Sequence, residues 1–107
     1  MRVMDMMGRG GVATKLTSTN TAQYFSAGLL TVSTKRMSGC VIQCDPAQLN
    51  SVRVTWGGTT PTQAGPLGIY MAPGDIMRIV GEFNCETFQY ISAVAGSAST
   101  LQIIPEY

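Results

Sequence analysis

The chain has 107 residues, a length that predicts one domain with a single modest core. Hydrophobic residues make up 45% of it and charged residues only 12%. This balance is typical of a β-rich structural domain and argues against a helical bundle or a disordered tail. The net charge of +1 argues against specific or high-affinity nucleic-acid binding through phosphate neutralisation.

Residues 1–20 differ in composition from the rest and are interpreted as an extended N-terminal arm. Four of the first seven residues are Met, and Gly-Arg-Gly-Gly follows at 8–11. Met side chains are unbranched and adapt to irregular surfaces. We therefore expect the arm to lie against its own domain or a neighbouring subunit, the alternative being a terminus without fixed contacts.

Residues 21–107 are predicted to form a small antiparallel β-sandwich, Ig-like or jelly-roll-like, in an all-β fold. Short β-like segments alternate with turn residues at intervals of about ten residues, as in sandwiches and small barrels. These segments lie at 28–35, 39–45, 51–56, 67–71, 76–81, 87–94 and 100–107. Within 51–56, Val52, Val54 and Trp56 alternate with polar residues, so all three are expected to face the core.

Turn and capping residues punctuate these segments. Pro73 and Gly74 between two apolar segments predict a type II turn, because Gly takes a positive φ at little cost. A short helical turn is compatible with residues 45–50, where Asp45 can cap it, and another with residues 81–88.

Three cysteines, Cys40, Cys44 and Cys85, leave at least one thiol unpaired. Together with a start that lacks the apolar core of a signal peptide, they indicate assembly in a reducing cytoplasm. They are interpreted as small buried hydrophobes, and since the chain has no His, no metal site is predicted. No run of 18 apolar residues occurs, so no membrane span is expected.

Motifs for catalysis or cofactor binding are weak. Gly8 to Ala13 fits a loose dinucleotide pattern, but no strand and helix flank it. The glycines between Trp56 and Pro66 lack the P-loop spacing and its Lys. Four carboxylates that could act as paired acids are interpreted as solvated surface charges: Asp45, Asp75, Glu82 and Glu86. We therefore predict no enzyme activity, no catalytic residue and no cofactor.

The second half of the chain carries a set of turn motifs that we identify with a known group. After the segment at 51–56 come Gly-Gly-Thr-Thr-Pro-Thr-Gln-Ala-Gly at 57–65, Ala-Pro-Gly-Asp at 72–75 and Gly-Ser-Ala-Ser-Thr-Leu-Gln-Ile at 96–103. In this order they resemble small β-sandwich virion proteins of tailed bacteriophages, several of which are capsid decoration or cement proteins. Many members have Asp where this chain has Gly57. A Gly-x-x-Pro-Thr turn is also similar to one in a small domain appended to chitin-degrading enzymes.

The phage resemblance implies a decoration protein that binds the assembled lattice of the major capsid protein and stabilises the head. It implies a dimer or trimer on the capsid exterior, assembled in the host cytoplasm. The alternatives are head–tail joining, tail or fibre attachment, or a carbohydrate-binding or adhesin module. Candidate contact residues fall in the arm, which would lie on the major capsid protein or an adjacent copy, and in the Thr-Pro-Thr turn: Arg2, Met4, Met6, Met7, Arg9, Lys15, Thr59, Thr60, Pro61, Thr62 and Gln63.

Overall fold

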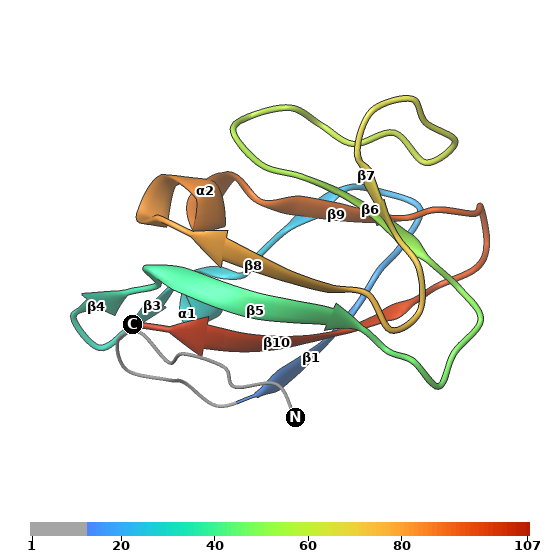
Figure 1. Cartoon of the computed structure of the whole chain (residues 1–107). Coiled ribbons are helices and arrows are strands. Elements are labelled where there is room, and N and C mark those ends of the chain that lie inside the picture. Colours follow the sequence, from blue (N-terminus) through green and yellow to red (C-terminus); the bar gives the residue numbers. More distant parts are fainter. Residues whose placement is uncertain (1–12) are drawn as a thin grey trace.

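The computed structural model describes residues 13–107 and has two four-stranded antiparallel sheets packed face to face (Figure 1). The first sheet has the order β1 (Thr14–Thr17), β10 (Thr100–Glu106), β5 (Gly39–Cys44) and β8 (Ile76–Val80). The second has the order β2 (Gln23–Tyr24), β9 (Gln89–Ser92), β6 (Val52–Thr55) and β7 (Ile69–Met71). The prediction of a small all-β sandwich is confirmed.

Smaller elements close one end of the sandwich. They are the helical turn α1 (Ala27–Leu30), the hairpin strands β3 (Thr31–Val32) and β4 (Lys35–Arg36), and the helix α2 (Glu82–Thr87). Figure 1 shows α2 at the same end as the β3–β4 hairpin, directly after β8. The helix predicted as an option at 81–88 is therefore present.

The core lies between the sheets and follows the two-residue period of the strands. In β5, Cys40, Ile42 and Cys44 are fully buried, while Val41 and Gln43 point to the outer face. From the second sheet, β6 contributes Val52 and Val54. The burial predicted for Val52 and Val54 from their alternation, and for Cys40 and Cys44 as small hydrophobes, is confirmed.

Three aromatic side chains form a second group in the core, beside the aliphatic residues of β5 and β6. Phe25 and Phe88 stack with ring centroids 4.8 Å apart, and Tyr90 packs beside both rings. Phe88 directly follows α2 and is fully buried, so it fixes the position of the helix against the sheets.

The segment predicted as an arm, residues 1–20, contains a strand of the first sheet. Thr14–Thr17 form β1, which pairs with β10 along its whole length. Ser18 is then buried, where its Oγ lies 2.8 Å from Ser92 Oγ and accepts a hydrogen bond from the Ser99 N–H. Leu16 packs against the core from this strand. Residues 14–18 are thus part of the sandwich, and residues 1–12 lie outside the described residues.

The single strand predicted at 28–35 is wrong. The Ser26 side chain accepts a hydrogen bond from the Leu29 N–H and caps α1, and the chain then enters a hairpin. Ser33 has a φ of 56°, which a two-residue hairpin loop requires. Leu30 is therefore the last residue of α1, whereas Val32 belongs to β3 and is exposed.

Turns predicted from Asp, Pro and Gly are largely confirmed. Gly74 has a φ of 92°, and the Asp75 N–H donates to Ala72 O, as in a type II turn. The Asp75 carboxylate in turn accepts from the Ala72 N–H. Asp45 accepts from the Ala47 N–H at 2.9 Å, but this segment is a turn and not a helix.

Gln48 ties the 45–50 turn to the start of β10. Its Nε2 donates to Ser99 Oγ and Thr100 O, and its Oε1 accepts from the Thr100 N–H. We expect Gln48→Ala to lower the free energy of unfolding by about 1–2 kcal/mol, since partly buried backbone groups lose their partner. Urea unfolding measures the loss. Gln63→Ala, which removes one exposed hydrogen bond, is the control and should cost about 0.5 kcal/mol or less; equal losses would contradict the role of Gln48.

Tyr107 should make the free energy of unfolding depend on pH in the alkaline range. Its OH donates to Leu29 O, and burial raises its pKa above the ordinary value. As the pH rises, the Tyr107 hydroxyl of the unfolded chain loses its proton before that of the folded chain. The contribution of Tyr107 to the free energy of unfolding is therefore complete below about pH 10 and is lost as the pH rises through the folded-state pKa. Tyr107→Phe should therefore reduce the fall in urea midpoint between about pH 8 and about pH 11. Burial also raises the pKa of Tyr90. If the variant shows the same fall as the parent, the pH dependence comes from another group such as Tyr90, and this account of Tyr107 is contradicted.

Candidate functional site

The segment between β6 and β7 is a long loop that folds back over the second sheet. Gly57 and Gly58 have φ of 82° and 98° and turn the chain away from Trp56. Thr59 O then accepts hydrogen bonds from Thr55 Oγ1 and from Gln89 Nε2. The loop is therefore fastened to the strands that it leaves and crosses.

Arg53 supports this loop from below. It points to the outer face of β6, where its guanidinium lies 5.4 Å from the centroid of the Tyr70 ring and donates to Gly68 O. A Cβ at Gly68 would come within 3.1 Å of Arg53 Cβ and 3.3 Å of Pro61 Cβ. Close packing of backbone against these side chains holds the loop in one shape.

A shallow apolar groove opens where this loop meets the ends of β6 and β7. It has a volume of about 330 Å³. Three large apolar side chains in it are exposed: Trp56 (40%), Leu67 (47%) and Ile69 (53%). Val54, Thr55, Thr59, Pro66 and Gly68 complete the lining. A contiguous group of exposed apolar side chains on a fixed loop is typical of a contact surface for a partner or ligand.

The prediction that Trp56 faces the core is wrong. β6 ends at Thr55, so Trp56 is one residue beyond the strand and its side chain extends past the covered part of the sheet. Ile69, which pairs across from Val54, is exposed for the same reason at the start of β7. Trp56 and Ile69 are both on the side of the sheet that faces the core, but they lie where the first sheet no longer covers it. Their apolar side chains are therefore exposed and line the groove.

The predicted contact residues in the Thr-Pro-Thr turn differ in their exposure and in their hydrogen bonds. Thr59 and Thr60 are exposed, as a contact role requires. Pro61 is buried under the loop and cannot touch a partner, which corrects that prediction. Thr62 exchanges hydrogen bonds with Leu67, and Gln63 donates to Asn20 Oδ1. Of these five residues only Thr59 lines the groove, and the sequence analysis did not select Trp56, Leu67 or Ile69.

Of the predicted arm residues, the structure places Lys15, which is exposed on β1 opposite Gln102. The remaining candidates lie outside the described residues: Arg2, Met4, Met6, Met7 and Arg9. Their role stays a prediction.

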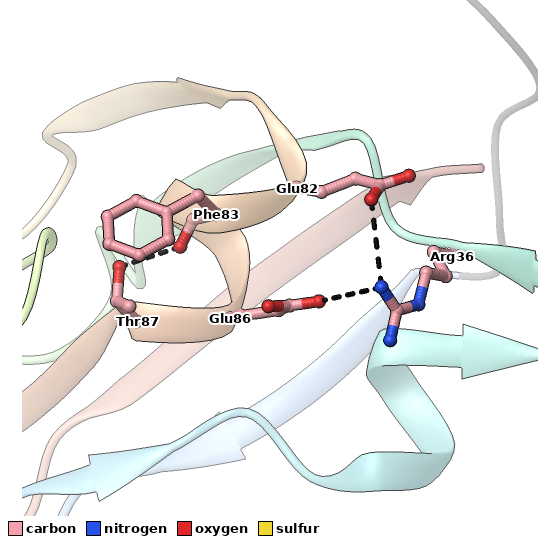
Figure 2. Close-up of polar contacts among 5 residues, drawn as sticks. All are labelled: Arg36, Glu82, Phe83, Glu86 and Thr87. Carbon is pink, nitrogen blue, oxygen red and sulfur yellow. Dashed lines mark hydrogen bonds and ion pairs between the residues drawn. The ribbon is translucent and has the colours of Figure 1, made fainter.

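Helix α2 connects to the groove loop through two successive hydrogen bonds. The Gly57 N–H donates to Thr87 Oγ1, and this hydroxyl donates to Phe83 O. On the opposite side of α2, Glu82 and Glu86 point toward Arg36 of β4, at 3.9 and 3.4 Å (Figure 2). These carboxylates serve as exposed ion-pair partners one helical turn apart.

The buried thiols belong to the core. Cys40 on β5 and Cys85 on α2 are both buried, and the interaction with the Cys85 thiol together with burial raises the pKa of Cys40. All three cysteines are free thiols. Within residues 13–107, no three His, Cys, Asp or Glu side chains come together in a way that could hold a metal ion.

Neither helix in the described part of the chain is long and apolar enough to cross a membrane. No family model, curated protein or solved structure matches the chain.

Proposed function

We propose that the protein is a structural virion protein of a tailed bacteriophage, a decoration protein that binds the assembled lattice of the major capsid protein on the capsid exterior. The groove formed by Trp56, Leu67 and Ile69, with Thr59 and Thr60 at its margin, is the proposed contact. The exposed Trp in this groove is the observation that carries the proposal, because Trp side chains dominate the energy of many protein interfaces.

The surroundings of the groove support docking of a rigid body. The loop is held by Arg53 below it and by Thr87 beside it. A surface that is already ordered loses little conformational entropy on binding. The turn motif at 57–65, one of those that carry the resemblance to phage virion proteins, lies in this loop, and the motif at 72–75 follows β7.

Stabilisation of the head would follow from mass action. A protein that binds only the closed lattice stabilises it by about 2.7 kcal/mol per site when its concentration is about a hundred times Kd. Each contact then needs only an ordinary interface, of roughly 1,600 Å² in total. Copies arranged as dimers or trimers around the capsid symmetry axes would repeat this gain many times.

The test is co-sedimentation with shells. Shells of the major capsid protein from the same genome are assembled, mixed with the purified chain and sedimented. We expect saturable binding at hundreds of copies per shell, and no binding to unassembled capsid protein. A handful of copies per virion would favour head–tail joining, tail or fibre attachment instead. A genome without a major capsid protein would overturn the virion proposal.

A carbohydrate-binding or adhesin role is the second candidate, and the exposed Trp56 favours it specifically. A sugar ring can pack against an indole face, and Leu67, Ile69 and Pro66 line the same groove. Pull-down on chitin and cell-wall glycans decides between the two. Retention on a glycan that is lost in Trp56→Ala, without binding to shells, would replace the capsid proposal.

A further inference from the structure

Strand β7 forms one edge of the second sheet, and in the described part of the chain no strand pairs with its other side. Toward β9, β6 is bonded through its odd-numbered positions, as the hydrogen bond from the Ala93 N–H to Ser51 O shows at the end of this ladder. The even-numbered residues of β6 therefore bond to β7, where they lie opposite Ile69 and Met71. The N–H and C=O of Tyr70, between these two, point away from β6 to the open edge.

The side chain of Tyr70 lies in one row with that of Arg53 on β6. The two residues are opposite each other in the β6–β7 pair, so both side chains point to the outer face of the sheet. The Arg53 guanidinium reaches toward the edge, because its central carbon lies 5.4 Å from the centroid of the Tyr70 ring. Since Tyr70 is 53% exposed, a residue added beyond β7 in the same row would meet both side chains.

Arg53 is a half-buried cation without an anionic partner in the described part of the chain. The ion pairs of that part are made by Arg36 and Arg78. Of the five N–H donors of the Arg53 guanidinium group, Nη1 donates to Gly68 O at 3.4 Å, and Nε is buried without a hydrogen-bond partner among the described residues. Gly65 packs against Nη2, since a Cβ at Gly65 would lie 3.3 Å from it. A carboxylate is the protein group that pairs best with such a guanidinium.

Charge decides between a second copy of the chain and a different partner at this edge. If β7 of two copies paired with each other about Tyr70, both Arg53 side chains would lie in the same row of the joined sheet. Like charges at neighbouring positions of a sheet repel each other. An extended partner segment with an acidic side chain opposite Tyr70 would instead complement the charge of Arg53.

We propose that β7 takes up an extended segment of a partner protein as an added strand, with an Asp or Glu of that segment beside Tyr70 and paired with Arg53. Main-chain hydrogen bonds hold such a strand, and its alternate side chains give specificity. The residue next to the carboxylate points to the other face, beside Ile69 in the groove, and is therefore large and apolar. The partner is the major capsid protein of the proposed function, on which this inference rests.

Photo-crosslinking from position 70 identifies the bound segment. The full chain with p-benzoylphenylalanine in place of Tyr70 is bound to shells of the major capsid protein and irradiated, and the crosslinked peptide is sequenced by mass spectrometry. We expect one segment of the capsid protein, in which an Asp or Glu is next to a large apolar residue. The proposal is overturned by a crosslink only to another copy of the chain, by a capsid segment that lacks this pair of residues, or by no crosslink to shells that the parent binds.

Blocking the edge gives a quantitative test. Tyr70→Pro removes the N–H that points to the open edge, and Pro is tolerated at such positions of edge strands. Tyr70→Ala loses the same ring but keeps the N–H, so it is the matched reference. We expect Tyr70→Pro to bind shells at least about tenfold more weakly than Tyr70→Ala. Equal dissociation constants would overturn the inference and leave the proposed function in place, whereas a parent chain that does not bind shells would overturn both.

Arg53 provides a second comparison, which also serves if Tyr70→Pro does not fold. Arg53→Gln removes the charge, whereas Arg53→Lys keeps it, and both lose the planar fork of the guanidinium group. We expect shell binding to be at least about tenfold weaker in Arg53→Gln and within about threefold of the parent in Arg53→Lys. The control Arg36→Gln removes an exposed charge of β4 and should bind like the parent. Equal losses in the Gln and Lys variants of Arg53 would mean that this residue only supports the loop, and would overturn the proposed ion pair.

Discussion

Phe88→Ala is expected to lower the free energy of unfolding by about 3–5 kcal/mol, the largest effect of any single truncation proposed for this chain. Phe88 is fully buried and stacks on Phe25 at 4.8 Å. Its removal leaves a cavity between the sheets that neither Phe25 nor Tyr90 can fill without leaving its own packing. For a domain whose total stability is about 5–15 kcal/mol, this loss approaches unfolding.

Chemical denaturation measures the effect. The urea midpoint of Phe88→Ala should fall with little change in the slope m, because the surface exposed on unfolding is nearly the same. Phe83→Ala supplies a matched control, since Phe83 lies on the adjoining helix α2 and is 63% exposed. Its expected effect is within about 0.5 kcal/mol. Comparable losses in the two variants would mean that the core is not centred on the Phe25–Phe88 stack.

Sequence reasoning was most successful where one strand has one buried face. Val52 and Val54 alternate with polar residues, and β6 buries both. Cys40 and Cys44 were expected to be buried, and β5 buries both of them together with Ile42. In such strands the side-chain period alone determines which residues enter the core.

The errors occur where an element ends or changes. Trp56 fits the alternation of buried residues in β6, but the hydrogen-bonded strand ends at Thr55. The alternation therefore predicts a buried Trp56, whereas its side chain is exposed. At Ser33, a positive φ divides what looked like one strand into a hairpin. The strand Thr14–Thr17 has only one large apolar residue, and its place in the sheet depends on pairing with β10, which is more than 80 residues away in sequence.

The groove could not be found from local sequence for a related reason. Its walls come from the end of β6, the start of β7 and the loop between them, and they meet only because several glycines in that loop adopt positive φ. The glycine-rich composition predicted a turn region correctly. The side chains that such a region exposes depend on the conformation of its backbone. In this loop the backbone conformation also buries Pro61 and brings the Leu67 N–H into a hydrogen bond with Thr62 Oγ1.

Trp56→Ala is expected to weaken binding to capsid shells by at least about thirtyfold, which corresponds to the loss of about 2 kcal/mol typical of an interface hot spot. The indole is the largest exposed side chain in the groove, and its removal takes away one of the three large apolar side chains that the groove exposes. Since 40% of the Trp56 side chain is already exposed, its loss should affect folding far less than the loss of Phe88.

Sedimentation of shells at several protein concentrations gives the two dissociation constants. Leu49→Ala removes an exposed apolar side chain of the 45–50 turn, outside the groove, and should bind shells like the parent. Ile104→Thr is a second control, because it changes an exposed apolar residue on the outer face of the first sheet and leaves the groove intact. Shell binding that survives Trp56→Ala and is lost in Ile104→Thr would move the docking surface to that sheet, whereas loss only in Trp56→Ala places the contact at the groove.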